Sequence, residues 1–193
     1  KPAVEKLYKD IESTEHDYIK VDELAEMKKL AADLLNQKII CFDTETTSIN
    51  ANDAELVGIA FAYEKGKAYY VPVPSDPIES AAIVDIFRPV LEHSDIAKTA
   101  HNYKYDSIVM KRHGVALRGP VRDTLIAHYL LNPDLRHKMD YLAETILNYK
   151  PIPIEKLIGK GKNQLSMRDI SIDKVVPYAS EDADITLQLD DIL

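Results

Sequence analysis

The stretch Lys38-Ile39-Ile40-Cys41-Phe42-Asp43-Thr44-Glu45 joins a short apolar run to two carboxylates. An apolar run of this length predicts a buried β-strand. Residues two apart in an extended segment point to the same side, so Asp43 and Glu45 can face one cleft at the edge of a sheet and bind one cation. The same spacing recurs at Asp53-Ala54-Glu55 without an apolar strand before it. The position after a strand, rather than the spacing itself, therefore favours a site at Asp43 and Glu45.

Two later segments carry further acids on predicted helices. Asn102-Tyr103-Lys104-Tyr105-Asp106 begins a predicted helix, with Asn102 as its expected N-cap and Asp106 one turn further on. Tyr178 and Asp182 are four residues apart and share one face of another predicted helix. Each segment alone is explained as well by an ordinary helix with a solvated acid. The three segments together, in this order, favour a common site.

Gathering four acids in one cleft without nearby cations is unfavourable, because like charges raise one another's pKa. Divalent metal ions offset that repulsion, and hard carboxylate oxygens suit Mg²⁺ or Mn²⁺. The sequence has no Cys/His cluster with zinc spacing. The neighbouring acids Glu181 and Asp184 point elsewhere on the helical wheel and are expected to be solvated. We therefore expect a metal-dependent phosphoryl-transfer site.

Length and charge limit the remaining possibilities. A chain of 193 residues is long enough for one well-buried domain, and we expect a single domain over 1–193 with a lead-in segment at 1–20. The net charge of −8 argues against a domain that binds nucleic acid by bulk positive charge, although a neighbouring domain could supply that charge. The chain starts at Lys1 and stops at Leu193 inside a helical pattern, so we expect a piece of a longer polypeptide.

Membrane spans, a signal peptide and paired cysteines would each indicate a cellular location. No apolar run is long enough to cross a bilayer and no signal peptide is visible, so a membrane is not an expected partner. Cys41 is the single cysteine, so no internal disulfide can form, which fits a reducing cytoplasm. We interpret Cys41 as a small core residue.

Hydrophobic periodicity and turn residues predict strands early and helices late, which favours an α/β class with a central mixed β-sheet. A hairpin is expected around Gly66, and Pro177 is expected to kink or restart the last helix. The expected strands are 38–42, 56–63, 67–73 and 96–100, and the expected helices are 22–36, 79–92, 103–113, 123–131, 139–147 and 171–193. Residues 150–162 are expected to be a loop.

The three acidic motifs resemble those of the DEDD superfamily of 3′-5′ exonucleases, in the subgroup whose third motif carries Tyr. Longer stretches are similar to the proofreading domain of bacterial family A DNA polymerases (DNA polymerase I), and the likeness runs from about Asn36 to Leu193. Those stretches are 100–106, 122–124, 139–144, 159–165 and 178–189. Within them, Gly159-Lys160-Gly161-Lys162-Asn163-Gln164 favours polymerase I over RNase D-like relatives.

The resemblance implies an RNase H-like exonuclease fold, with helices flanking the sheet, and two divalent metal ions, Mg²⁺ or Mn²⁺. It implies that Asp43, Glu45 and Asp182 hold one ion. Asp43 would bridge to the second ion with support from Asp106, and Tyr178 and Glu45 would orient the attacking water. The resemblance also implies substrate contacts at Thr44, Ile49, Asn102, Arg136 and Ile154.

Two of these implied contacts carry reservations. Arg136 matches an arginine suspected of contacting phosphate, but an exposed charge beside a helix explains it equally well. Ile154 stands where relatives carry an aromatic residue. Because an isoleucine stacks on a base less well than an aromatic ring, we expect single-stranded ends to be held more weakly here.

The function implied is proofreading: removal of nucleoside 5′-monophosphates from single-stranded or frayed 3′ DNA ends, beside a polymerase domain of the same chain in the bacterial cytoplasm. Two alternatives stay open. The domain could be a non-catalytic structural or DNA-binding module of a polymerase, or an RNase D-like 3′-5′ exoribonuclease. The oligomeric state is left open.

Overall fold

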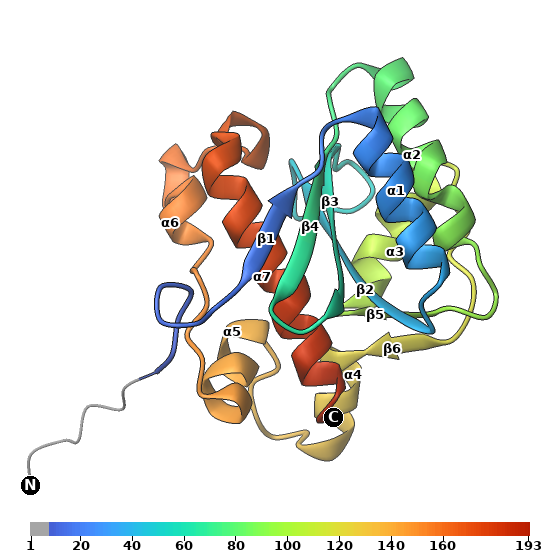
Figure 1. Ribbon diagram of the computed structural model, residues 1–193. Coiled ribbons are helices and arrows are strands. Elements are labelled where there is room, and N and C mark those ends of the chain that lie inside the picture. Colours follow the sequence, from blue (N-terminus) through green and yellow to red (C-terminus); the bar gives the residue numbers. More distant parts are fainter. Residues whose placement is uncertain (1–7) are drawn as a thin grey trace, which may run out of the picture.

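The computed structural model describes residues 8–193. Within this range the chain forms a six-stranded mixed sheet in the order β1-β4-β3-β2-β5-β6 (Figure 1). The strands are β1 (Asp17–Lys20), β2 (Ile39–Thr46), β3 (Leu56–Glu64), β4 (Lys67–Pro72), β5 (Ala97–Ala100) and β6 (Val121–Asp123). The predicted hairpin is confirmed: β3 and β4 are antiparallel, and Gly66 in the turn between them has φ +75°.

Strand β2 lies inside the sheet and carries the first acidic motif. It pairs antiparallel with β3 on one side and parallel with β5 on the other. The strand continues to Thr46, four residues beyond the predicted end, because Asp43 to Thr46 still pair with β3. Both carboxylates of the first motif are therefore held by a paired strand and not by a loop.

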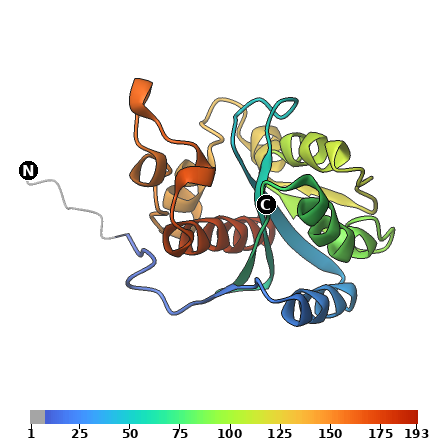
Figure 2. The ribbon, with the colours of Figure 1, turned by 90° about the horizontal axis from the view of Figure 1, so that it is seen from above.

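Helices cover both faces of the sheet, as predicted (Figure 2). Helices α1, α2 and α3 lie on one face, and α7 lies across the other. The helices are α1 (Leu24–Leu35), α2 (Pro77–Leu91), α3 (Tyr103–Arg112), α4 (Thr124–Leu131), α5 (Met139–Leu142), α6 (Glu155–Ile158) and α7 (Ile172–Asp190), with a π-helical turn at Ala143–Leu147 and 3₁₀ turns at Gly161–Asn163 and Met167–Asp169.

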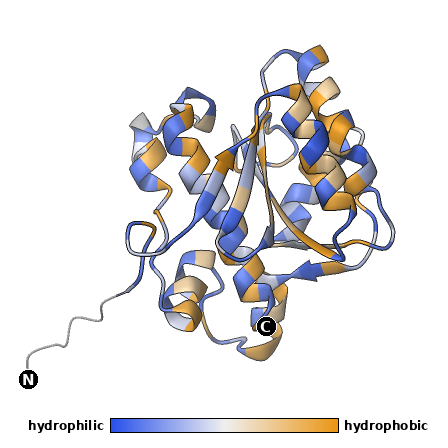
Figure 3. Ribbon diagram, in the orientation of Figure 1, coloured by the Kyte–Doolittle hydropathy of each residue, from blue (hydrophilic) through white to orange (hydrophobic). Residues whose placement is uncertain are grey.

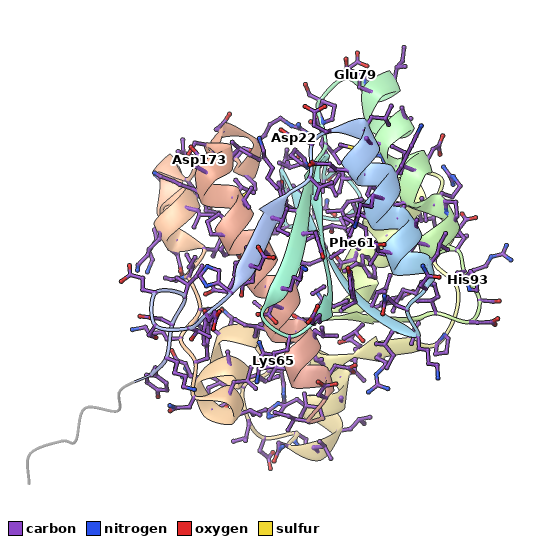
Figure 4. All side chains as sticks on the ribbon, in the orientation of Figure 1. Asp22, Phe61, Lys65, Glu79, His93 and Asp173 are labelled. Carbon is purple, nitrogen blue, oxygen red and sulfur yellow. The ribbon has the colours of Figure 1, made fainter. Side chains whose placement is uncertain are left out.

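Alternation along β2 and β3 divides the core between the two faces. Ile40 and Phe42 pack with α1 and α2, whereas Cys41, the predicted small core residue, is fully buried on the α7 side. Hydrophobic residues accordingly follow the strands and helices α1 and α2 (Figure 3). Phe61 is buried on the same side as α1 and α2, whereas Asp173 is exposed at the start of α7 (Figure 4).

Small residues allow α7 to approach the sheet closely. Ala60 and Ala62 on β3 and Ala179 and Ala183 on α7 are all fully buried in one cluster. Gly58 on β3 is required by a neighbouring strand, because a Cβ built there would lie 2.1 Å from the hydroxyl oxygen of Tyr70 on β4. Close packing of this kind tolerates little added volume. The sheet face under α7 is therefore matched to this one helix.

The lead-in prediction is wrong for part of its range. Residues 17–20 form β1, which pairs parallel with β4 and closes one edge of the sheet. Residues 1–7 of the predicted lead-in segment lie outside the described residues. Strands β1 and β6 were missed because runs of four and three residues are too short to show a period of two.

Two predictions about the C-terminal third also need correction. The loop predicted at 150–162 contains the short helix α6. Helix α7 runs from Ile172 to Asp190 through Pro177, so of the predicted kink or restart the restart does not occur. Packing of the helix against the sheet compensates for the one backbone hydrogen bond that the proline removes. No helix in residues 8–193 has the length and apolar character needed to span a bilayer.

The close approach at Gly58 can be tested by stability. We expect Gly58→Ala to lower the free energy of unfolding by about 1–3 kcal/mol, because the added methyl group must displace the Tyr70 ring. Urea unfolding followed by circular dichroism measures the loss. Tyr70→Leu should recover part of it in the double variant, since it vacates the contested space. A Gly58→Ala protein as stable as the wild type would contradict the packing described here.

Candidate functional site

The carboxylates predicted to bind metal converge at one end of the sheet. Asp43 and Glu45 extend from β2 toward α7, and Asp182 extends from α7 toward β2. One carboxylate oxygen of each lies within 4.8 Å of the corresponding oxygens of the other two. The convergence follows from two periodicities: residues two apart share a strand face, and α7 lies across that face.

Asp106 reaches the site from the opposite face of the sheet. It is buried on α3, and its Oδ1 accepts hydrogen bonds from the Thr44 hydroxyl at 2.6 Å and the Thr44 backbone N–H at 3.1 Å. Thr44 points to the α3 side because it alternates with Asp43 and Glu45. Asp106 therefore stands outside the close group of three and is fixed beside it through the strand.

Burial makes all four carboxylates difficult to ionise. Withdrawal from solvent raises the pKa of Asp43 to about 6. It also raises the pKa of Glu45, Asp106 and Asp182 well above their usual ranges, and the nearby charge of Asp43 raises each of them further. No residue between 8 and 193 forms a salt bridge with any of these four acids. Within residues 8–193 the cluster therefore has no paired cation to balance it.

The residues present fit a divalent metal ion. Three carboxylates offer hard oxygen ligands at short mutual distances. Asp182 Oδ1 is buried and has no hydrogen-bond partner among the described residues, so its lone pairs are unused. A divalent cation would satisfy that oxygen and neutralise the repulsion. The acidic group of Asp43, Glu45 and Asp182 is compatible with divalent metal binding.

Tyr178 lies one turn before Asp182 on α7 and is nearly buried. Burial raises the pKa of its hydroxyl far above the usual value, and the charges of Asp182, Glu45 and Asp43 raise it further. The hydroxyl therefore stays protonated at neutral pH. It can donate a hydrogen bond at the edge of the cluster.

A cleft of about 820 Å³ opens beside the cluster. It is lined by all five residues of the acidic and tyrosine motifs and by Thr44, Ile49, Asn102 and Ile154. The Ile49 side chain is 99% exposed at the rim. Arg136 does not line this cleft and is exposed between α4 and α5. The structure thus brings together every predicted substrate contact except Arg136.

Asn102 is the N-cap residue of α3, as predicted, but the side-chain hydrogen bond expected of an N-cap is missing. Asn102 has a left-handed backbone, φ 72°, and its side chain makes no capping hydrogen bond. The Asp123 carboxylate instead accepts from the backbone N–H groups of Asn102 and Tyr103, at 3.2 and 3.0 Å. An acid brought in from β6 thereby fixes the turn that holds Asn102 in the cleft.

Several cleft residues were missed by the sequence reasoning. His101 lines the cleft, its Nδ1 lies 2.8 Å from the Thr124 hydroxyl, and burial lowers its pKa to about 4, so it is neutral at physiological pH. Its position next to Asn102 was the available signal. Segment 154–167 forms the opposite wall of the cleft. Besides the predicted Ile154, it contributes Ile158, Gln164, Leu165, Ser166 and Met167. No periodic pattern marks those wall residues.

The prediction that Glu181 and Asp184 are solvated is also wrong, because both are buried. Asp184 accepts hydrogen bonds from the Tyr18 hydroxyl and the Gly66 N–H, both at 2.9 Å. The helical wheel correctly turned these acids away from Asp182. It gave no sign that strand β1 and the loop around Tyr149 would cover them.

Comparison with known proteins agrees with this geometry. A model of the 3′-5′ exonuclease family matches residues 18–193. DNA polymerase I of Pseudomonas aeruginosa is 39% identical over 161 residues, covering 79% of this chain and 18% of the polymerase. DNA polymerase I of Borreliella burgdorferi is 35% identical over 174 residues, covering 89% of this chain and 18% of that protein. The chain thus spans less than a fifth of the length of these relatives and matches one part of them.

Solved structures establish the fold. The catalytic core of RRP6 from Trypanosoma brucei has a TM-score of 0.70 at 20% identity, covering 99% of this chain and 51% of that one. NrnC of Brucella melitensis has a TM-score of 0.69 at 17% identity, covering 93% and 80%. These are RNase H-like exonuclease folds, so the predicted fold class is confirmed. The chain therefore belongs to the proofreading 3′-5′ exonuclease family of DNA polymerase I, a family of metal-dependent nucleases.

Proposed function

We propose that this domain removes nucleoside 5′-monophosphates from single-stranded or frayed 3′ ends of DNA. The observation that carries the proposal is the convergence of Asp43, Glu45 and Asp182 inside a cleft. Buried carboxylates without a protein cation are unfavourable unless a metal ion joins them. A nuclease can use such a metal site to hydrolyse a phosphodiester.

In this proposal Asp43, Glu45 and Asp182 would hold one Mg²⁺ or Mn²⁺ ion, and Asp43 and Asp106 would help to hold a second. When bound, the ions supply Lewis-acid polarisation of the phosphodiester and make water more acidic. Tyr178 donates a hydrogen bond to the attacking water, which its protonated hydroxyl supports. Glu45 accepts from the same water and orients it.

The cleft would receive the last nucleotide of the strand. Thr44 and Ile49 contact its sugar and base, Asn102 contacts the nucleotide from the turn before α3, and Ile154 packs against a base from the opposite wall. Reaction at the terminal phosphodiester requires the last bases to leave the duplex, which favours frayed ends. Arg136, exposed beside α5, would contact a phosphate of the approaching strand.

The setting of the domain follows from its relatives. They are DNA polymerases I of which this chain matches one part, so we propose an adjacent polymerase domain and a place in the bacterial cytoplasm. The net charge of −8 leaves this domain a weak binder of DNA by long-range attraction. The polymerase domain would then supply much of the DNA affinity.

Replacement of a cluster acid tests the function. We expect Asp182→Asn and Asp43→Asn to lower the rate on 3′-labelled single-stranded DNA with Mg²⁺ by at least about 100-fold, since even outer partners of a metal site are worth about 10–100-fold. Asp53→Asn is the matched control, because it alters an exposed acid of the same Asp-x-Glu spacing outside the cleft. Equal activity of all three variants would refute the assignment, and equal wild-type rates on matched RNA would point to an exoribonuclease.

Metal affinity should depend on pH. The cluster acids hold protons more tightly when folded than unfolded, with Asp43 at a pKa of about 6 against an ordinary 3.8. Without metal the folded state therefore binds more protons between about pH 4 and 6, so these acids make stability fall as pH rises through that window. Mg²⁺ and Mn²⁺ compete with the protons, so their affinity should rise as pH passes about 6.

Calorimetry with Mn²⁺ at several pH values measures this dependence. Asp43→Ala should abolish tight binding, and urea unfolding in a chelator should show a shallower pH dependence for Asp43→Asn than for the wild type. A Mn²⁺ affinity that is the same at about pH 5 and about pH 8 would contradict the electrostatic account.

The wall residue Ile154 sets an expectation for strand binding. Stacking of a base on an aromatic side chain is worth roughly 1–3 kcal/mol, of which an isoleucine supplies only part. We expect Ile154→Phe to tighten the Kd for a short single strand by about 3–10-fold in a fluorescence anisotropy titration. Ile78→Phe, at an exposed position on α2 outside the cleft, should leave the Kd unchanged. No tightening by Ile154→Phe would show that this side chain does not contact a base.

A further inference from the structure

Glu181 is a fully buried carboxylate next to the acidic cluster of Asp43, Glu45 and Asp182, and it takes no part in that cluster. It and the following residue leave α7 in different directions: Asp182 faces β2, whereas Glu181 faces the segment after the π-helical turn. The Glu181 Oε1 accepts from the Tyr149 hydroxyl and its Oε2 accepts from the Ile152 backbone N–H, both at 2.6 Å. No salt bridge to Glu181 occurs within residues 8–193, so two neutral donors are its hydrogen-bond partners there.

The two donors stand at the start of the segment that forms one wall of the cleft. Ile154 lies two residues after Ile152, and the wall continues through Ile158 and Leu165 to Met167. Figure 1 shows this segment, with α6, running beside α7. Ile152 and Ile158 also pack against the apolar cluster under α7, but such contacts set no exact register along the helix.

The far end of the wall is fastened separately. Arg168 donates to the backbone carbonyls of Leu56 at 2.7 Å and Val73 at 3.2 Å. Between its two ends the wall is built on a four-residue helix and a three-residue turn. Short elements of this kind have little stability of their own. The position of the wall therefore depends on its two ends, and Glu181 holds the end nearer to Ile154.

We propose that Glu181 is a positioning residue for strand binding: it fixes Ile152 and thereby holds the Ile154 wall at a set distance from the Asp182 carboxylate of the same helix. Adjacent residues on α7 then determine where the metal site lies and where the facing wall lies. The proposal rests on the proposed function only where DNA is the probe, because the position of the wall can be measured without DNA.

The same helix offers a matched control. Asp184 is buried to a similar degree, and its hydrogen bonds run to Tyr18, Gly66 and Gln188, none of which lines the cleft. Loss of the Asp184 carboxylate should therefore weaken the fold without moving the wall. Any effect of Glu181 variants beyond that of Asp184 variants reports on the cleft.

The experiment compares Glu181→Met, which keeps the volume but cannot accept these hydrogen bonds, with Asp184→Leu. We expect Glu181→Met to raise KM for a single-stranded oligonucleotide about tenfold, the loss that corresponds to one charge-assisted hydrogen bond, with kcat within about twofold. Trypsin should cleave faster after Lys156, Lys160 and Lys162 in this variant. Mn²⁺ affinity should be unchanged, and Asp184→Leu should show neither effect.

Glu181→Gln provides the rescue. Its amide oxygen can accept from the Ile152 N–H while its amide N–H donates to the Tyr149 oxygen, so KM should stay within about twofold of the wild type. If Glu181→Met does not fold, Tyr149→Phe removes one of the two donors and should shift KM and trypsin cleavage in the same direction.

Three results would overturn the proposal: an unchanged KM in Glu181→Met, equal effects in Asp184→Leu, or a fall in kcat together with Mn²⁺ affinity, which would mean that Glu181 acts through Asp182. An inactive wild type would contradict the proposed function alone, because the trypsin comparison still decides whether Glu181 holds the wall.

Discussion

Asp43, Glu45 and Asp182 repel one another, and burial strengthens that repulsion because little water remains to screen it. The fold has to hold these charges together against this force. It does so with its most constrained parts: β2 is paired on both sides, and α7 is a 19-residue helix packed across the sheet. A flexible loop in place of the strand or the helix would let the carboxylates move apart and water enter between them. The rigidity of the strand and the helix is therefore what allows the repulsion at the site to persist.

Helix α7 distributes its acids by its own geometry. A rotation of about 100° per residue sends Asp182 to the metal cluster, Glu181 to the segment before the cleft wall, and Asp184 to β1 and the β3–β4 turn. Each acid meets a different kind of partner. Asp182 retains an unpaired oxygen suited to a cation, whereas Glu181 and Asp184 are satisfied by hydroxyl and backbone donors. Carboxylates of one helix thus face a candidate metal site in one direction and make structural hydrogen bonds in the others.

The two faces of the sheet supply different residues to the site. The face under α7 presents Asp43 and Glu45, and the opposite face presents Thr44, whose hydroxyl and N–H hold Asp106. Asp123, at the end of β6, fixes the turn that brings Asn102 into the cleft. Parallel strands β2, β5 and β6 end near one another, so residues from three separate segments meet there. The cleft is consequently built from strand ends, the helices α3 and α7, and one irregular wall.

The sequence by itself determined the mixed sheet and most helices, because strand and helix periods are local properties that survive in the order of residues. The members of the acidic cluster and the family followed from the resemblance of three short motifs to those of a known family. Asp43, Glu45, Tyr178 and Asp182 could be named from their spacing and motif alone. Only the tertiary structure decided that Glu181 and Asp184 are buried and that residues 17–20 close the sheet. It also decided that the Asp123 carboxylate, and not the Asn102 side chain, accepts the backbone N–H groups of the turn before α3. Each of these depends on a partner more than twenty residues away or on a segment too short to carry a period, and no local pattern records such contacts.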